Sequence, residues 1–263
     1  MQSISFPALN LNLQINRVAF ELFGIKIYWY AIFIVLAIVL AIFFFKKDDG
    51  KYGIKFENIL EAAIFVIPIA IVCARIYYIV FNLNYYVQNP IKMFDLRNGG
   101  LAIYGGIIGG VITIYIYCKK KKIKFISFLD YIIPYLALGQ AIGRWGNFVN
   151  VEAYGTQTTS FFRMGIFKEA TYMEVHPTFL YESIIDFAIF IILYLFRNSK
   201  RLEGKITYIY LIIYGFFRFF IEQLRTDSLM LGNIRVSAIF SVILFIIGII
   251  GLIFSEKNAT RNL

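Results

Sequence analysis

Seven long apolar runs dominate this sequence and limit the kind of fold that it can adopt. They span residues 25–45, 59–81, 100–118, 127–143, 178–196, 206–223 and 234–254. An α-helix of about 20 apolar residues is long enough to cross the hydrocarbon core of a bilayer. Hydrophobic residues make up 60% of the chain and charged residues 16%, which excludes an ordinary soluble domain. We therefore predict an all-α integral membrane protein of the cell membrane, with seven transmembrane helices.

Lysine and arginine are concentrated in alternate loops between these runs. Residues 46–56 hold four of them, residues 119–126 five and residues 197–205 four, whereas the 34 residues 144–177 hold only three. Short loops rich in positive charge stay in the cytoplasm. These three loops and the C-terminus are therefore expected in the cytoplasm, and the N-terminus outside. The outer-face loops are then 82–99, 144–177 and 224–233. The loop charges also explain the net charge of +10, so no nucleic-acid partner is expected.

Nothing in the sequence divides the chain into separate domains. It lacks a Pro- or Ser-rich linker, so residues 1–263 are predicted to form a single polytopic membrane domain. Cys73 and Cys118 fall in or at the ends of apolar runs, where thiols pack and do not form a disulfide framework. No zinc pattern is present, and neither a metal nor a cofactor is expected. Residues 9–13 alternate leucine with asparagine over too few positions to predict a strand.

A polar string follows the fourth apolar run. Residues 143–155 read GRWGNFVNVEAYG, which brings an arginine, two asparagines and a glutamate to the end of a hydrophobic helix. Charges so close to hydrocarbon are costly and usually mark a functional site. For Arg144 alone, a side chain that snorkels to the interface is an equally good interpretation. For the whole string, with its fixed spacing, a site is the better one.

The sixth run carries a second polar pattern. Tyr214, Arg218 and Glu222 are spaced by four residues and therefore share one helix face, which Arg225 extends. The alternative is an ion pair between Arg218 and Glu222 that only neutralises itself in the bilayer.

A third pattern opens the fifth run. Residues 176–182 read HPTFLYE, and Pro177 suits a helix start because its missing N–H would be unpaired there. Glu182 and Asp186 stand one turn apart in hydrocarbon, so both need partners. His176 is the only histidine of the chain, and a role in the site is as plausible for it as an incidental position.

Together these strings resemble the signatures of the bacterial prolipoprotein diacylglyceryl transferases. The family patterns are written G-R-x-G-N-F-x-N-x-E-x-x-G, H-P-x-x-L-Y-E and Y-G-x-x-R-x-x-x-E-x-x-R-x-D, and every fixed position is filled here. A W-Y pair of the family is matched by Trp29 and Tyr30, of which Trp29 is expected to be an interface anchor. The resemblance runs from about Trp29 to Asp227.

The resemblance implies a reaction between two substrates in the outer leaflet region. The thiol of a lipobox cysteine in an exported preprotein attacks the glyceryl carbon of phosphatidylglycerol, a thioether forms and glycerol 1-phosphate leaves. The implied catalytic residues are Arg144, Arg218, His176 and Tyr104. The implied residues for binding phosphatidylglycerol are Arg144, Asn147, Asn150, Glu152, Tyr30, Gly155, Glu222 and Arg225. Arginine suits a phosphate because its guanidinium offers parallel donors.

One position departs from the family. Many members carry a histidine, proposed as a general base, directly before the Gly-Gly pair of the third run, and this chain has Tyr104 there. A tyrosine hydroxyl is a poor base near neutral pH but a serviceable hydrogen-bond donor. His176 then becomes the leading candidate to take the thiol proton, ahead of Glu152 and of a thiolate held by arginines.

Two other classes of membrane protein fit the sequence less well. A seven-helix receptor or retinal protein shares the outside N-terminus, but residues 234–254 contain no lysine for a Schiff base, which excludes the usual link to retinal. A transporter or channel would show an internal repeat or polar residues along several helices. Here the charged motifs lie toward one end of the helices, so a transferase is the better interpretation.

Overall fold

The structure, a computed structural model, describes residues 2–95, 99–169, 171–232 and 234–261. The chain separates into two compact units. The first unit comprises Met1–Phe44 and Ile132–Leu263, and the second comprises Phe45–Tyr131. Parts of all three predicted outer loops, residues 96–98, residue 170 and residue 233, lie outside the described residues.

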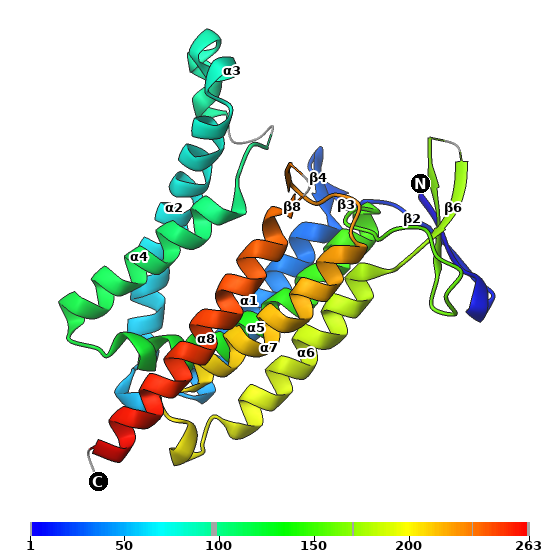
Figure 1. Ribbon diagram of the computed structural model, residues 1–263. Coiled ribbons are helices and arrows are strands. Elements are labelled where there is room, and N and C mark those ends of the chain that lie inside the picture. Colours follow the sequence, from blue (N-terminus) through cyan, green and yellow to red (C-terminus); the bar gives the residue numbers. More distant parts are fainter. Residues whose placement is uncertain (1, 96–98, 170, 233, 262–263) are drawn as a thin grey trace. The chain divides into compact units, whose positions relative to one another are not determined.

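Helices make up most of the described chain, as the apolar runs predict (Figure 1). They are α1 (Trp29–Lys47), α2 (Phe56–Phe81), α3 (Leu83–Gln88), α4 (Ile103–Lys121), α5 (Phe125–Asn150), α6 (Thr178–Phe196), α7 (Ile206–Leu224) and α8 (Val236–Arg261). Short 3₁₀ helices lie at Pro7–Leu9, Lys51–Gly53, Pro90–Phe94 and Lys200–Leu202. Each predicted run falls mainly within one of the long helices.

Within the described residues, five helices are long and apolar enough to cross a membrane: α1, α2, α5, α6 and α8. The protein is therefore a multi-pass membrane protein. The other two predicted spans, α4 and α7, are helices of 19 residues each. They are less apolar because α4 contains glycines and ends in lysines, and α7 carries Arg218 and Glu222. Seven spans therefore stay a prediction.

The prediction of an all-α fold is wrong, because the chain also contains strands. They are β1 (Gln2–Phe6), β2 (Leu11–Ile15), β3 (Val18–Leu22), β4 (Ile25–Tyr28), β5 (Met164–Lys168), β6 (Thr171–Val175), β7 (Met230–Leu231) and β8 (Ile234–Arg235). The largest sheet among the described residues is antiparallel, with strand order β2-β1-β5-β6. The sequence did not predict these strands because five residues give only a weak strand pattern. In addition, β1 pairs with β5, which lies far away in the sequence.

This sheet rests on the ends of two helices of the first unit. Ile4 of β1 pairs with Ile166 of β5, and both side chains are fully buried. They pack in one cluster with Phe148 of α5 and Phe179 of α6, whose rings stack with centroids 4.6 Å apart. Each such burial contributes about 1.5–3 kcal/mol. The cluster holds the sheet at the end of α5 that carries the polar string.

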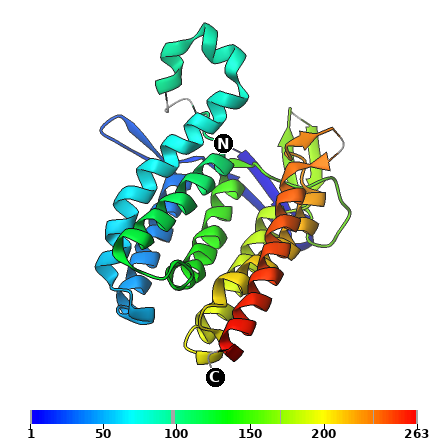
Figure 2. The same ribbon diagram turned by 60° about the vertical axis from the view of Figure 1, so that its left-hand side comes forward.

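Helices α6, α7 and α8 of the first unit pack against one another. Helix α7 lies between α6 and α8, and the three helices stay adjacent in both views (Figures 1 and 2). Gly215 and Gly248 permit the close contact of α7 with α8, since a Cβ atom at Gly215 would come 2.7 Å from the carbonyl oxygen of Ser241. Tyr210 Oη of α7 donates to Gln140 Oε1 of α5 at 2.7 Å. These contacts bring α5, α6 and α7 together.

In the second unit, α2 packs against α4 through the glycines of α4. A Cβ atom at Gly105 would come 2.5 Å from the carbonyl oxygen of Cys73, and one at Gly109 would come 2.6 Å from the Cys73 Sγ atom. Small residues four apart thus let the neighbouring helix approach closely.

Candidate active site

The polar string begins inside α5, which runs on to Asn150. Residues 144–150, predicted as part of an outer loop, are instead the last two turns of this helix. The helix ends where Val151 adopts a left-handed conformation, with φ 51°. The N–H of Val151 donates to the Phe148 carbonyl and the N–H of Glu152 to the Asn147 carbonyl, both at 3.0 Å. This hydrogen-bond pair is the Schellman ending of a helix.

A left-handed valine is unfavourable because its branched side chain meets the backbone. Ala153, two residues later, also has a positive φ of 55°. Such conformations cost about 1–3 kcal/mol each and tend to occur where a site requires a particular backbone path. Here the path turns Glu152 back toward the helix end.

Three of the predicted polar side chains meet at that turn. Asn147 Nδ2 donates to Glu152 Oε1 at 2.9 Å, and Asn150 Nδ2 approaches the same oxygen at 3.4 Å. Arg144 Nη1 lies 3.5 Å from Asn147 Oδ1. The string therefore forms one connected network that runs from Glu152 to Arg144.

Arg144 is connected on its other side to Glu182 of α6. Its Nη2 atom lies 2.5 Å from Glu182 Oε2, and the Glu182 side chain is only 4% exposed. The same oxygen accepts from Arg218 Nη1 of α7 at 2.7 Å. Among the described residues, the buried Nε of Arg144 has no hydrogen-bond partner. Arg144 therefore keeps donor capacity for a ligand.

Arg225, which follows the last turn of α7, contacts the second oxygen of Glu182 at 3.0 Å. Two parallel hydrogen bonds from Arg225 also reach Asp227, at 2.9 and 2.7 Å. Burial acts to raise the pKa of Asp227, but the hydrogen bonds and charge of Arg225 outweigh it and lower that pKa. Arg218 has a second partner in Glu222, 2.7 Å away. Glu182 thus joins three arginines from α5, α7 and the end of α7.

The segment after the string is held beside this cluster by backbone hydrogen bonds. Gly155 N–H donates to the His176 carbonyl at 2.9 Å, and Thr156 N–H donates to the Leu224 carbonyl at 2.7 Å. Only a glycine fits at 155, because a Cβ atom there would come 2.7 Å from the His176 Cβ atom. The His176 Nδ1 atom lies 3.3 Å from the Tyr181 hydroxyl, beside Glu182 in sequence.

Tyr30, on the first turn of α1, contacts the string at Gly146. A Cβ atom at Gly146 would overlap the Tyr30 ring, whereas one at Gly143 would meet nothing within 4 Å. Gly143 and Gly146 therefore differ in their structural role.

The remaining predicted site residue, Tyr104, lies in the first turn of α4 in the second unit, whereas the arginines belong to the first. Its catalytic role stays a prediction.

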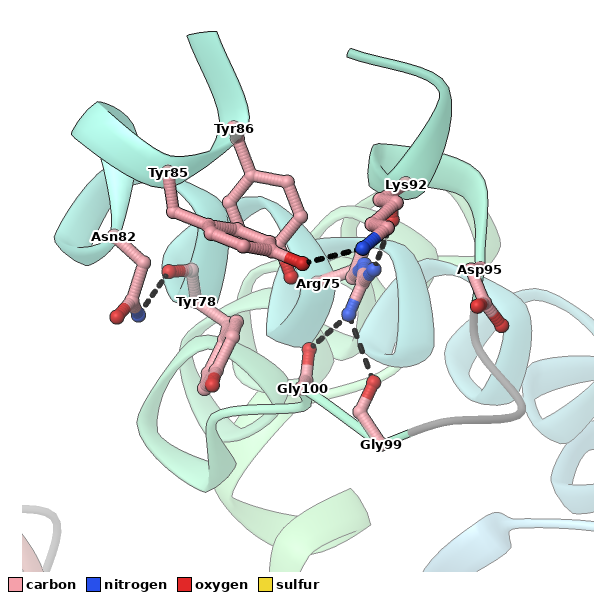
Figure 3. A pocket seen from close by; sticks show the side chains of 9 residues that line it. All are labelled: Arg75, Tyr78, Asn82, Tyr85, Tyr86, Lys92, Asp95, Gly99 and Gly100. Atoms are coloured by element: carbon pink, nitrogen blue, oxygen red, sulfur yellow. Dashed lines mark hydrogen bonds between the residues drawn. The ribbon is translucent and has the colours of Figure 1, made fainter. Parts of the chain in front are cut away.

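The second unit has a pocket of about 420 Å³ near the start of α4. Its lining residues are Arg75, Tyr78, Asn82, Tyr85, Tyr86, Lys92, Asp95, Gly99 and Gly100 (Figure 3). Arg75 is buried and donates to the carbonyl oxygens of Lys92 at 2.6 Å, Met93 at 2.9 Å, and Gly99 and Gly100 at 2.8 Å. This arginine therefore fastens the chain segments on either side of residues 96–98 to α2.

Comparison with known proteins decides the family of the chain. The family model described as prolipoprotein diacylglyceryl transferase matches residues 17–254. The chain belongs to this family.

Individual relatives agree over nearly the full length. The chain is 48% identical over 248 residues to the phosphatidylglycerol–prolipoprotein diacylglyceryl transferase of Clostridioides difficile, covering 94% of this chain and 98% of that protein. The protein of the same name from Finegoldia magna is 50% identical with the same coverage. The one from Bacillus cytotoxicus is 43% identical over 257 residues, covering 95% of each chain. The predicted resemblance is confirmed, and the chain is a transferase of this family.

Glu182 is the residue that the prediction of the site left out. The sequence did signal that Glu182 and Asp186 need partners, because both stand in an apolar run. It did not identify the partners of Glu182, because they lie on α5 and at α7 and come close to α6 only in the folded protein. Asp186 is 2% exposed, and within the described chain its Oδ2 atom has no hydrogen-bond partner.

Proposed function

We propose that this protein transfers the diacylglyceryl group of phosphatidylglycerol to the lipobox cysteine of exported prolipoproteins. The observation that carries the proposal is the group of three arginines around Glu182, at the end of apolar helices, in a chain of this family. A phospholipid presents its phosphate at the end of its apolar chains, at the depth where such arginines stand. The products are a thioether-linked prolipoprotein and glycerol 1-phosphate, and the reaction is the first step of lipoprotein maturation.

In this reaction the cysteine sulfur forms a bond to the glyceryl carbon as the bond from that carbon to the phosphate oxygen breaks. The electron pair of the broken bond leaves with glycerol 1-phosphate. Arg144 holds the phosphate and stabilises the charge that develops on the leaving oxygen, through the donors that Glu182 does not occupy. Arg218 supports the same charge from α7. The thiol proton passes to His176 or departs with the phosphate.

The other predicted residues orient these groups. Asn147, Asn150 and Glu152 form the network that continues from Arg144, and they hold the glycerol head group. Glu222 and Arg225 keep Arg218 and Glu182 in place. Tyr30 and Tyr104 donate hydrogen bonds to the substrates, and Gly155 lets the chain pass close to His176.

The site faces the outer side of a membrane crossed by seven helices, with a cytoplasmic C-terminus. The distribution of lysine and arginine supports this orientation. A second observation supports the grouping of the segments: β1 pairs with β5, and Thr156 bonds to Leu224. The N-terminal strand, residues 144–177 and the segment after α7 therefore belong to one end of the first unit.

The test is to incubate the purified protein with phosphatidylglycerol and a peptide that carries a lipobox cysteine. The mass of the peptide is then measured by mass spectrometry. The expected result is a mass increase equal to one diacylglyceryl group and an equal amount of glycerol 1-phosphate. A peptide with serine in place of the cysteine, and the Arg218→Gln variant, are the controls and should give no product. Solute uptake or ion current with no lipid transfer would favour a transporter or channel instead.

A further inference from the structure

An apolar groove lies between the β1–β2 hairpin, the ends of α5 and α6, and residues 161–163. We call it the hairpin groove; its volume is about 290 Å³ and its walls include Leu9, Leu11, Trp145, Phe161, Phe162 and Leu180. Leu9, Phe161 and Phe162 are 68%, 63% and 61% exposed although they belong to segments outside the spanning helices. Exposed apolar side chains that gather in this way commonly mark a binding surface.

The hairpin groove adjoins the candidate active site. Trp145 follows Arg144 on α5, and Leu180 stands two residues before Glu182 on α6. Glu182 and its three arginines are not among the lining residues, but the groove is built on the same ends of α5 and α6 that carry Arg144 and Glu182.

A second apolar cavity, of about 420 Å³, begins at the same two residues, since Trp145 and Leu180 line both spaces. Its other walls come from α1, α5 and α6, among them Leu36, Ile142 and Ile184. Each of these helices is long and apolar enough to cross a membrane. Two apolar spaces thus share Trp145 and Leu180 as walls, one formed by helices long and apolar enough to cross a membrane and the other partly by β1 and β2.

We propose that the hairpin groove binds the apolar residues next to the acceptor cysteine of the preprotein. This inference rests on the proposed function, which needs two substrates with apolar parts at one site. The cavity among α1, α5 and α6 is lined by apolar residues of three helices that are long and apolar enough to cross a membrane, which suits an acyl chain. The hairpin groove is roofed by strands, so an acyl chain would have to leave the bilayer to enter it, whereas an exported peptide need not.

The charge of the hairpin groove also fits an uncharged peptide segment. Arg163 is the charged residue among its lining side chains, and Glu174 lies 2.6 Å from the Nε atom of that arginine. The groove therefore offers no net charge to a phosphate head group. Its aromatic and aliphatic walls select for the size of apolar side chains.

The experiment compares binding of two peptides, identical except that the residues before the acceptor position are leucine in one and alanine in the other. Both carry serine in place of cysteine, so binding is measured without turnover. Trp145 lines the groove, and replacing Trp29 with phenylalanine leaves it as the sole tryptophan of the full chain. The emission of Trp145 then reports binding in phosphatidylglycerol vesicles.

In this background we expect the leucine peptide to bind about tenfold more tightly than the alanine peptide, as size selection in an apolar pocket allows. The double substitution Phe161→Ser with Phe162→Ser should reduce this ratio to below about twofold. The matched control is Phe23→Ser, which removes an aromatic side chain that is 95% exposed in the β3–β4 turn, outside the groove. It should retain the full ratio.

A second readout separates the groove from the reaction. With cysteine peptides, the double variant should lose the leucine preference in kcat/KM while its response to phosphatidylglycerol chain length stays unchanged. If the ratio survives in the double variant, the peptide assignment is wrong. If chain-length preference changes instead, the groove holds lipid. If the leucine peptide binds more tightly as predicted but the unmodified protein transfers no diacylglyceryl group, the groove binds the peptide and the proposed function is wrong.

Discussion

Glu182 on α6 brings a carboxylate oxygen to 2.5 Å from the Nη2 atom of Arg144, near the end of α5. The glutamate is 4% exposed and the arginine 21% exposed, so the pair is largely removed from water. Because Arg218 and Arg225 contact the same carboxylate, removal of its charge leaves three arginines without this partner. Unbalanced buried charges are among the most destabilising changes in a protein.

We therefore expect Glu182→Gln to abolish most activity and to lower the unfolding temperature. Losing one partner of a buried pair costs about 3–5 kcal/mol. The control is Glu174→Gln, which breaks a more exposed pair with Arg163 and should cost less than about 1 kcal/mol. Thermal unfolding and the rate of lipid transfer check both variants. Equal behaviour of the two variants would contradict the central position of Glu182.

Arg144→Lys tests whether the geometry of the guanidinium matters or only its charge. Lysine keeps the charge, but it cannot offer parallel donors to Glu182 and a phosphate together. We expect the substitution to lower kcat/KM at least tenfold, which corresponds to a loss of about 1.4 kcal/mol of transition-state stabilisation. Arg144→Ala should lose nearly all activity. Full activity of the lysine variant would show that a point charge is sufficient.

Gly146→Ala and Gly143→Ala form a matched pair within α5. A methyl group at 146 would overlap the Tyr30 ring, while one at 143 meets open space. Gly146→Ala should therefore destabilise the protein, with overpacking of about 1–3 kcal/mol, and Gly143→Ala should stabilise it by about 0.5–1 kcal/mol. Adding Tyr30→Ala should restore stability to the 146 variant. If it does not, the close contact with Tyr30 is not the reason for this glycine.

The proton acceptor is tested by the dependence of rate on pH. We expect His176→Gln to slow transfer more than Tyr104→Phe, because a hydroxyl lost from tyrosine removes a hydrogen bond worth only about 0.5–1.5 kcal/mol. An imidazole that accepts a proton also gives the rate a rise with pH that glutamine cannot. The rates of both variants and of the unmodified protein are compared with one lipobox peptide. An unchanged profile in His176→Gln would eliminate this histidine as the base.

The orientation in the membrane is tested by labelling single cysteines. Thr159→Cys should react with an impermeant thiol reagent in intact cells, and Lys120→Cys should react only after the cells are opened. Both positions are exposed, so neither result depends on burial. The background reaction of Cys73 and Cys118 is measured on the unmodified protein. The reverse pattern would overturn the outer position of residues 144–177.

Much of the helical architecture could be predicted from the sequence, and the sequence also indicated most residues of the candidate site. Long apolar runs can satisfy their backbone in a bilayer only as helices, so their positions were readable without knowledge of any partner. The charged strings were recognisable because charged groups next to apolar runs are energetically costly and usually mark a functional site. The confirmed family follows from the same strings.

The strands and the connections within the site required the tertiary structure. β1 is a short strand that pairs with its neighbour β2 and also with β5, and the pairing with β5 depends on the path of all the helices between them. Helix α5 ends at Asn150 because Val151 adopts a left-handed conformation. Valine rarely adopts this conformation, so the sequence did not predict it. The sequence places Glu182 in an apolar run, which indicates that its carboxylate needs partners. Its contacts with Arg144, Arg218 and Arg225 arise only when α5, α6 and α7 pack together, because charge pairing acts over a few ångströms in space and not along the chain.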